Sequence, residues 1–253
     1  MNAQAGEPPL AGLRAVVTGA SSGIGRAIAI AFATAGARVG IGFNRSSEAA
    51  RELADRIGPA HALLQSDLST SEGCAAIVAA AFAAFENVDV WVNNAGADVL
   101  TGEARDWPAE RKLDALIDVD LKATIRCSRL VAARMVGGGC IINIGWDHAT
   151  IDGMGGDNPE LFAAVKAGVL GFSKSLARSL APGIRVNVLC PGWVETAYGE
   201  GVDREFYDKV AAGTPLKRWG TPQDIAQAAV WLASPAAAFI TGQAINVNGG
   251  TVG

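Results

Sequence analysis

The chain has 253 residues, half of them apolar, and a formal net charge of −4. This is enough apolar material for one large domain, which we expect over residues 10–253 after a disordered lead-in over residues 1–9. The negative charge, without any basic cluster, excludes a typical nucleic-acid-binding protein. Four scattered cysteines form no Cys-x-x-Cys pair, so we expect reduced thiols rather than a disulfide framework or a metal site.

The N-terminus has no basic stretch followed by an apolar core, and no apolar run is long enough to cross a bilayer. We therefore expect a cytoplasmic protein without a membrane partner.

The first turn of the chain, residues 18–25, is rich in glycine. It follows a short apolar run at residues 14–17 and precedes an alanine-rich segment at residues 26–35, an order that indicates strand, turn and helix. Glycine lets a phosphate approach the backbone, and a helix N-terminus attracts anions. The spacing is Gly-x-x-x-Gly-x-Gly rather than Gly-x-Gly-x-x-Gly, so the turn alone fits a nucleotide site and a plain connection equally well.

Apolar runs then alternate with helical segments. Further strands are expected at residues 37–43, 61–65, 88–92, 140–144, 184–189 and 244–247, and further helices at residues 48–57, 71–85, 112–135, 161–180 and 222–233. Strands that are apolar on both faces and alternate with helices predict an α/β fold: a doubly wound, parallel, seven-stranded sheet with helices on both faces, as in Rossmann-like domains.

Polar or glycine-rich turns follow most of these strands, at residues 18–25, 44–46, 66–68, 93–96, 145–160 and 190–198. Because the carboxyl ends of parallel strands meet at one edge, these turns predict a cofactor cleft there. We interpret residues 190–220 as a lid over the substrate.

Four motifs together resemble the short-chain dehydrogenase/reductase family over residues 13–250. The glycine turn is similar to the family's Thr-Gly-x-x-x-Gly-x-Gly pattern. The other three motifs are Asp89 followed by Asn93, Asn94, Ala95 and Gly96; residues 191–196 after the sixth strand; and the tail at residues 241–250.

The resemblance implies a nicotinamide dinucleotide and a set of cofactor contacts. The expected residues are Gly19, Ser21, Ser22, Gly23, Ile24 and Gly25 for the pyrophosphate and adenosine ribose; Asp67 and Leu68 for the adenine; Asn94, Ala95 and Gly96 for the ribose region; and Pro191, Gly192, Val194 and Thr196 around the nicotinamide carboxamide.

The charge at the end of the second strand distinguishes NAD from NADP. An acidic residue there would bind the ribose 2′-OH and repel a 2′-phosphate. This chain has Asn44, Arg45 and Ser46 instead, and a guanidinium favours a phosphate. We predict NADP(H); the alternative is that Arg45 is merely an exposed loop cation.

The resemblance also implies an altered catalytic set. The family uses Asn, Ser, Tyr and Lys, with the Tyr four residues before the Lys on one helix face. Lys166 is present, but Phe162 stands at the Tyr position. Gly145 and Trp146 replace the usual Ser pair, and Asp120 replaces the Asn. Asp120 either pairs with Lys166 across the site or is a structural helix carboxylate.

Asp147 and His148 follow Trp146 and are candidates for a replacement acid and base. The alternative is a solvated polar loop. Substrate walls are expected from aromatic residues: Trp146, Phe162, Trp193, and Tyr198, which could reach inward from the lid.

Three functions fit these residues. The first is an NADP(H)-dependent oxidoreductase that reduces an imine, an iminium ion or a conjugated C=C bond of a small organic substrate. The second is a non-redox enzyme for isomerisation, elimination or cyclisation, with Asp147 and His148 as its acid and base. The third is a non-catalytic NADP(H)-binding protein. The resemblance further implies a homodimer or homotetramer.

Overall fold

A computed structural model describes residues 7–59, 61–156 and 159–252. Within these residues, no helix combines the length and apolarity needed to cross a membrane. The lead-in expected over residues 1–9 lies mostly outside the described residues. Its described part, residues 7–9, is exposed, and the Pro8 carbonyl accepts the Ala11 N–H at 2.9 Å in a local turn. Leu10, the first residue of the expected domain, is fully buried.

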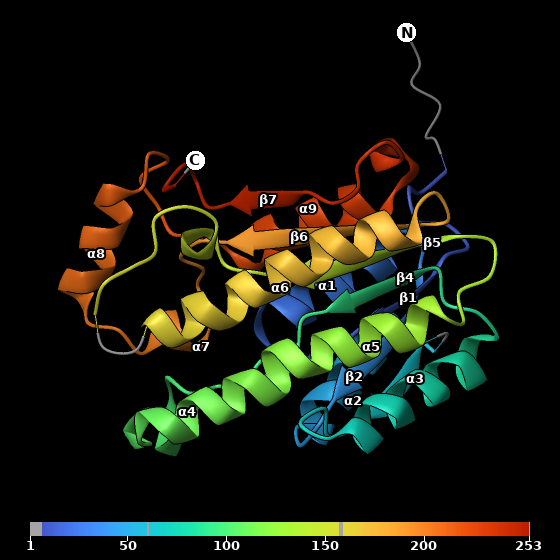
Figure 1. Cartoon of the computed structure of the whole chain (residues 1–253), viewed down its shortest axis with the longest axis horizontal. Helices are drawn as coiled ribbons and strands as arrows, with labels where there is room; N and C mark the ends of the chain where they lie inside the picture. Colours follow the sequence, from blue (N-terminus) through green and yellow to red (C-terminus); the bar gives the residue numbers. More distant parts are fainter. Residues whose placement is uncertain (1–6, 60, 157–158, 253) are drawn as a thin grey trace, which may run out of the picture.

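The core of the fold is one parallel sheet in the order β3-β2-β1-β4-β5-β6-β7 (Figure 1). This confirms the predicted seven-stranded α/β fold. The strand order reverses between β1 and β4, so the cleft expected at the carboxyl ends opens at that point. The strands are β1 Arg14–Val17, β2 Arg38–Phe43, β3 Ala62–Gln65, β4 Val90–Asn93, β5 Gly139–Ile144, β6 Ile184–Pro191 and β7 Ala244–Val247.

Helices cover both faces of the sheet (Figure 1). One face packs against α1 Gly23–Thr34, α2 Ser47–Ile57 and α9 Pro222–Ala233. The other packs against α3 Ser71–Phe85, α5 Ala123–Ala132 and α6 Pro159–Leu180. Burial of apolar side chains on both faces is why the strand sequences are almost continuously apolar.

In place of the single long helix expected at residues 112–135, the structure has three consecutive helical segments. They are α4 Ala109–Leu116, the π-helical η2 Ile117–Lys122, and α5. A π turn inserts one extra residue per turn and commonly marks a functional site. Here it contains the buried Asp120. The helix ends earlier than expected, before Gly137 and Gly138, whose φ angles are +81° and +101°.

The segment between β6 and α9, residues 192–221, is called the excursion here. It contains two helices that the sequence did not predict, α7 Ala197–Glu200 and α8 Arg204–Gly213. Asp203 caps α8 by accepting the Phe206 N–H at 2.7 Å. Trp219, only 1% exposed, anchors the end of the excursion. Short 3-10 turns complete the described elements: η1 Gly102–Asp106, η3 Asp147–Ala149 and η4 Pro235–Ala237.

The start of α9 is the one the sequence predicted. Thr221 is the N-cap, Pro222 is the first helical residue, and Asp224 completes a capping box. Arg218 also pairs with Asp224 at 2.7 Å, which helps to hold the pKa of that carboxyl below its usual value.

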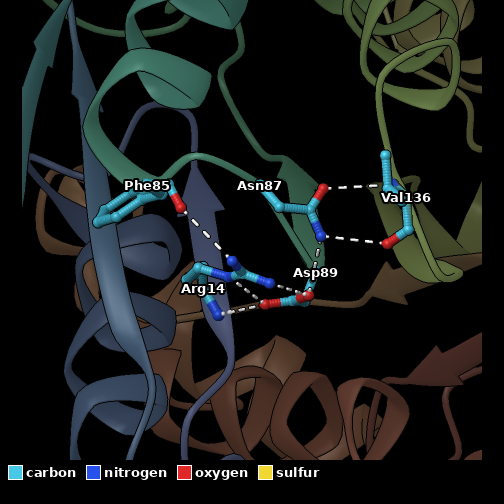
Figure 2. Close-up of polar contacts among 5 residues, drawn as sticks. All are labelled: Arg14, Phe85, Asn87, Asp89 and Val136. Carbon is cyan, nitrogen blue, oxygen red and sulfur yellow. Dashed lines mark hydrogen bonds and ion pairs between the residues drawn. The ribbon is translucent and has the colours of Figure 1, made fainter.

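The amino ends of β1 and β4 are joined by hydrogen bonds between Arg14 and Asp89 (Figure 2). The Arg14 backbone N–H and side-chain Nε both donate to Asp89 Oδ2 at 2.8 Å. Arg14 Nη2 donates to Asp89 Oδ1 at 2.9 Å. Asn87 extends these contacts, donating to Asp89 and exchanging two hydrogen bonds of 3.2 Å with the Val136 backbone. These contacts align the strands at the end opposite the cleft, so Asp89 has a structural role.

A buried polar chain aligns β4 and β5 with the helices on one face. Trp91 Nε1 donates to Asn93 Oδ1, and Asn93 Nδ2 donates to both Ser128 Oγ and Asn143 Oδ1, each at 2.8 Å. Asn143 Nδ2 donates to Ser173 Oγ of α6, also at 2.8 Å. This chain sets the position of α6, the helix that carries Phe162 and Lys166.

Candidate active site

The glycine turn after β1 is too tightly packed for side chains at two positions. Gly19 has a φ of +64°, and a Cβ there would lie 2.8 Å from the Ala95 Cα. A Cβ on Gly25 would lie 2.3 Å from the Gly19 carbonyl oxygen and 2.4 Å from Asn94 Nδ2. The glycines therefore let the turn close against the end of β4.

Thr18 holds this turn to the one after β4. Its Oγ1 accepts the N–H groups of Asn94 and Ala95, both at 3.0 Å. In return Asn94 Nδ2 donates to the carbonyls of Thr18 and Gly19, at 2.9 and 3.2 Å. The sequence prediction gave Thr18 no role of its own, although it is the first residue of the glycine pattern. Asn94 and Ala95 brace the sheet in addition to lying beside the cleft.

The N-terminus of α1 remains open to an anion. The Ser22 side chain makes no capping hydrogen bond, and the first turn contains no acidic residue. The N–H groups of the first turn therefore keep their positive potential, which suits a pyrophosphate. Thr196 lies against this turn, with its Cγ2 3.6 Å from the position of a Cβ on Gly23. The structure thus brings the turns after β1 and β6 together.

The residues expected to distinguish NAD from NADP are at the surface, after β2. Asn44, Arg45 and Ser46 are all exposed. Among the described residues, no ion pair involves the Arg45 guanidinium. Its charge nevertheless helps to lower the pKa of the nearby Asp67 carboxyl.

The two residues expected near the adenine differ in their exposure. Asp67 is exposed, and its Oδ1 accepts the N–H and Oγ–H of Ser69, which lowers the pKa of its carboxyl. Leu68 is only 8% exposed and packs in the core, so its contact with an adenine would be limited.

Asp120 and Lys166 form a buried ion pair. Lys166 Nζ lies 2.8 Å from Asp120 Oδ1, with side-chain exposures of 12% and 4%. Asp120 Oδ2 accepts the Ala97 N–H at 2.8 Å, and Lys166 Nζ donates to the Ile144 carbonyl at 3.3 Å. The pair joins the ends of β4 and β5 to η2 and α6. Gly96 lies directly over it, since a Cβ there would be 3.0 Å from Asp120 Oδ1.

Aromatic side chains stand beside this pair. Phe162 is half-buried on α6, one turn before Lys166, and its ring meets Trp146 edge to face at a centroid distance of 6.4 Å. Trp146 also contacts the His148 ring at 5.2 Å. The Phe162 ring, which carries no hydroxyl, therefore lies one helical turn before Lys166 on α6.

The side chains of Asp147 and His148 do not bond to one another. Asp147 is fully buried; its Oδ1 accepts the backbone N–H of His148 at 2.8 Å, and its Oδ2 accepts Asn248 Nδ2 at 3.2 Å. The His148 ring instead places Nδ1 3.1 Å from the Gly153 carbonyl. Burial raises the pKa of the Asp147 carboxyl. Each of the two side chains therefore has a hydrogen-bond partner of its own.

A groove of about 1000 Å³ runs from the outer side of α1 to Phe162. Trp146 is not among the described residues that line it and contacts the groove only through the Phe162 ring. At the substrate end the groove is lined by the loop after β4 and by the excursion after β6. The sequence prediction missed the first of these, because a loop of mixed composition carries no binding signal. The lining residues at this end are Ala97, Asp98, Val99, Leu100, Thr101, Phe162, Glu195, Thr196, Ala197 and Tyr198.

Trp193 is not among the described residues that line the groove. It stacks behind Tyr198 at 6.3 Å and also contacts Phe206 and Trp219. It supports the wall that Tyr198 presents. Pro191 and Gly192 lead out of β6, and Val194, 7% exposed, forms a bridge with Gly220 that closes the base of the excursion.

Within the described residues, no three His, Cys, Asp or Glu side chains gather as a metal site would require. The four cysteines are buried and free.

Comparisons with known proteins agree with this geometry. The sequence model of the family described as "Enoyl-(Acyl carrier protein) reductase" matches residues 19–252. The 3-oxoacyl-[acyl-carrier-protein] reductase FabG of Vibrio cholerae is 37% identical, over 95% of this chain and 98% of the relative. A short-chain dehydrogenase/reductase from Brucella melitensis has a similar structure, with a TM-score of 0.87 and 28% identity, covering 98% of this chain and 100% of that one. A short-chain dehydrogenase from Burkholderia cenocepacia, solved in complex with NADP, has a TM-score of 0.86 and 32% identity, covering 96% and 99%. The chain belongs to the short-chain dehydrogenase/reductase family of oxidoreductases.

Proposed function

We propose that this oxidoreductase uses NADP(H) to reduce an imine, an iminium ion or a conjugated C=C bond, and that it does so without a tyrosine proton donor. The observation that carries the proposal is Phe162, whose ring lines the substrate groove one turn before Lys166. Phenylalanine cannot supply a proton at that position.

The cofactor half of the site fits a nicotinamide dinucleotide. When bound, that cofactor supplies or accepts a hydride. The open N-terminus of α1 would hold the pyrophosphate, and Arg45 would hold a 2′-phosphate. Asn94, Ala95 and Gly96 would lie along the ribose region, with Val194 and Thr196 at the carboxamide. The NADP complex of the Burkholderia relative supports the choice of NADP(H).

Asp120 and Lys166 have a positioning role in this proposal. The Lys166 charge is balanced by Asp120 at 2.8 Å, so the ammonium is held in one place, one helical turn after Phe162. It can donate to a ribose hydroxyl there. Phe162 presents an apolar ring to the groove, so an acceptor carbon bound there would lie against hydrocarbon.

The chemistry of the acceptor then decides what can react. Hydride addition to an iminium carbon yields a neutral amine and needs no proton at that carbon. In a conjugated C=C bond, the proton is needed at a neighbouring atom, where water or another side chain can supply it. A ketone would develop alkoxide charge beside Phe162, which has no hydroxyl to stabilise it.

Charge at the substrate end favours a cationic acceptor over an anionic carrier. The described lining residues there include two acids, Asp98 and Glu195, and no lysine or arginine. The V. cholerae relative, by contrast, is named for an acyl carrier protein substrate. Reduction of a 3-oxo group is the second candidate, because relatives of that name match nearly the whole chain.

A panel of acceptors tests the proposal. NADPH oxidation is followed with a cyclic imine at pH values where it is protonated, a conjugated enone, a cyclic ketone of matched ring size and a 3-oxoacyl thioester. We expect turnover of the imine or enone and at most trace turnover of the two carbonyl compounds. Fast ketone or thioester reduction by the wild-type protein would contradict the proposal.

The same panel separates the other hypotheses. Conversion of a substrate with no change in nicotinamide absorbance would indicate non-redox chemistry. Tight NADPH binding without any turnover would indicate a binding protein, in which Lys166→Ala alters affinity alone.

We also propose that residues 190–220 form a substrate lid and that the cytoplasmic protein is a homodimer or homotetramer. Protection of the lid from proteolysis by cofactor and substrate tests the first proposal. Light scattering coupled to size exclusion tests the oligomeric state.

A further inference from the structure

Asp147 is a buried carboxylate without a cationic partner. Its side chain is fully buried, and none of the ion pairs among the described residues includes it. A carboxylate in such a place is tolerated only if hydrogen bonds satisfy its oxygens. The groups that satisfy Asp147 therefore indicate what the residue does.

Both of its oxygens are used, and the second one reaches far along the chain. Oδ1 accepts the His148 N–H at 2.8 Å, within the same turn. Oδ2 accepts Asn248 Nδ2 at 3.2 Å, from the segment after β7. Gly192, after β6, lies against both partners, because a Cβ there would be 3.0 Å from Asp147 Oδ2 and 2.7 Å from the Asn248 Cβ. The ends of β5, β6 and β7 thus meet at this carboxylate.

The Asn248 amide is oriented before it meets Asp147. Its Nδ2 donates to the Val252 carbonyl at 2.8 Å, and its Oδ1 accepts the Gly250 N–H at 3.0 Å. Reversing the amide would break both contacts. The C-terminal segment therefore presents a fixed N–H donor to Asp147.

On the other side, Asp147 belongs to the turn that follows Trp146. Its carbonyl accepts the Thr150 N–H at 2.9 Å, and the Trp146 carbonyl accepts the Ala149 N–H at 3.2 Å. Trp146 immediately precedes Asp147, and its ring packs on Phe162. A shift of the Asp147 side chain would move the backbone from which the Trp146 ring projects.

We propose that Asp147 is a positioning residue: its hydrogen bond with Asn248 ties the turn after β5 to the C-terminal segment and thereby sets the position of the Trp146 ring against Phe162, which lines the groove. The inference rests on the proposed role of Phe162 as a substrate wall, which the Trp146 ring supports from behind. It assigns Asp147 no proton transfer.

The test exchanges the two partners. In Asp147→Asn, an amide that still accepts the His148 N–H turns its own NH₂ toward the NH₂ of Asn248, so two donors meet. Asn248→Ala removes the same bond from the other side. The double variant Asp147→Asn/Asn248→Asp restores one donor and one acceptor, although it loses the bond to Val252. Asp152→Asn, an exposed carboxylate of the same loop, is the matched control.

Two readouts are needed, one of them independent of turnover. The protein is labelled with fluorotryptophan, and the Trp146 signal in its fluorine NMR spectrum is assigned with Trp146→Phe. Asp147→Asn and Asn248→Ala should shift or broaden that signal, the double variant should partly restore it, and Asp152→Asn should leave it unchanged. In turnover assays, Asp147→Asn should raise the KM of the accepted substrate about tenfold while NADPH affinity stays the same.

An unchanged Trp146 signal in both single variants would overturn the inference, as would a double variant no better than Asp147→Asn. If the signal responds as expected but the wild-type protein reduces none of the acceptors, the positioning role stands and the proposed function fails.

Discussion

At the carboxyl end of β1 the site is built from backbone, whereas at the carboxyl end of β5 it is built from side chains. The first region closes around glycines, with Thr18 and Asn94 binding one turn to the other and the α1 N–H groups left open. The second consists of the aromatic wall and the buried pair of Asp120 and Lys166. A backbone site needs only a few small residues, but a side-chain site changes its chemistry with every substitution. One region can therefore keep its ligand while the other changes its reaction.

The largest effect is expected in the backbone region, from Gly25→Ala. The new Cβ would lie 2.3 Å from the Gly19 carbonyl oxygen, so the turn must open. We expect NADPH affinity to fall by about a hundredfold or more, since the N–H groups would lose their common direction. Fluorescence titration with NADPH measures it.

Gly171→Ala is the matched control, because a Cβ at that helical position meets no atom within 4 Å. Equal affinity in the Gly25→Ala protein and wild type would break the account of the turn.

The side-chain region is tested by Lys166→Met. This change leaves the Asp120 carboxylate buried without its partner, and we expect unfolding free energy to fall by about 3 kcal/mol in urea titrations. Adding Asp120→Asn should recover much of the loss. The exposed pair Lys122 and Asp118 serves as the comparison, since Lys122→Met should cost less than about 0.5 kcal/mol. Similar losses in both pairs would show that burial does not distinguish them.

Arg45→Ser tests cofactor choice. Removing an exposed guanidinium that binds a 2′-phosphate should weaken NADPH binding about tenfold and leave NADH binding unchanged. Arg51→Ser, also exposed but on α2, is the control for net charge. A parallel loss for both cofactors would mean that Arg45 is only a loop cation.

The smallest effect is the pH dependence of stability from Asp147. Burial raises the pKa of this carboxyl in the folded protein above its unfolded value of about 3.9. The folded state therefore binds more protons than the unfolded state between these two pKa values, and stability falls as pH rises through that window. As the pH rises between these two pKa values, the melting temperature of the wild-type protein should decline relative to that of Asp147→Asn. A constant difference between the two proteins would contradict the raised pKa.

Local patterns were sufficient to predict the sheet and the turns along its edge. The alternation of apolar runs with helical segments predicted the seven parallel strands. The residues from Thr221 to Asp224 indicated the start of α9. Such signals lie within a few residues of each other, and they hold because the strands are buried on both faces.

The missed features depend on contacts between distant residues. The π turn at residues 117–122 has no local signature in the sequence. The contacts that accompany it join Asp120 to Ala97 and Lys166, which are far away along the chain. The bond from Asn248 to Asp147 spans 101 positions, and neither residue type predicts the other. The composition of residues 145–160 suggested an acid and base, but only the packing shows that Asp147 and His148 face different partners.

The central claim is that the aromatic residues Phe162 and Trp146, rather than the cofactor region, determine which reaction the protein performs. It is tested most directly by introducing hydroxyl groups at these two positions. The double variant Phe162→Tyr/Trp146→Ser is assayed for NADPH-dependent reduction of a cyclic ketone, with Lys166 intact and NADPH affinity measured alongside. We predict that ketone reduction rises about a hundredfold over wild type, the contribution expected of a positioned general acid, while NADPH affinity is unchanged. Wild-type ketone reduction as fast as that of the double variant, at equal NADPH affinity, would contradict the claim.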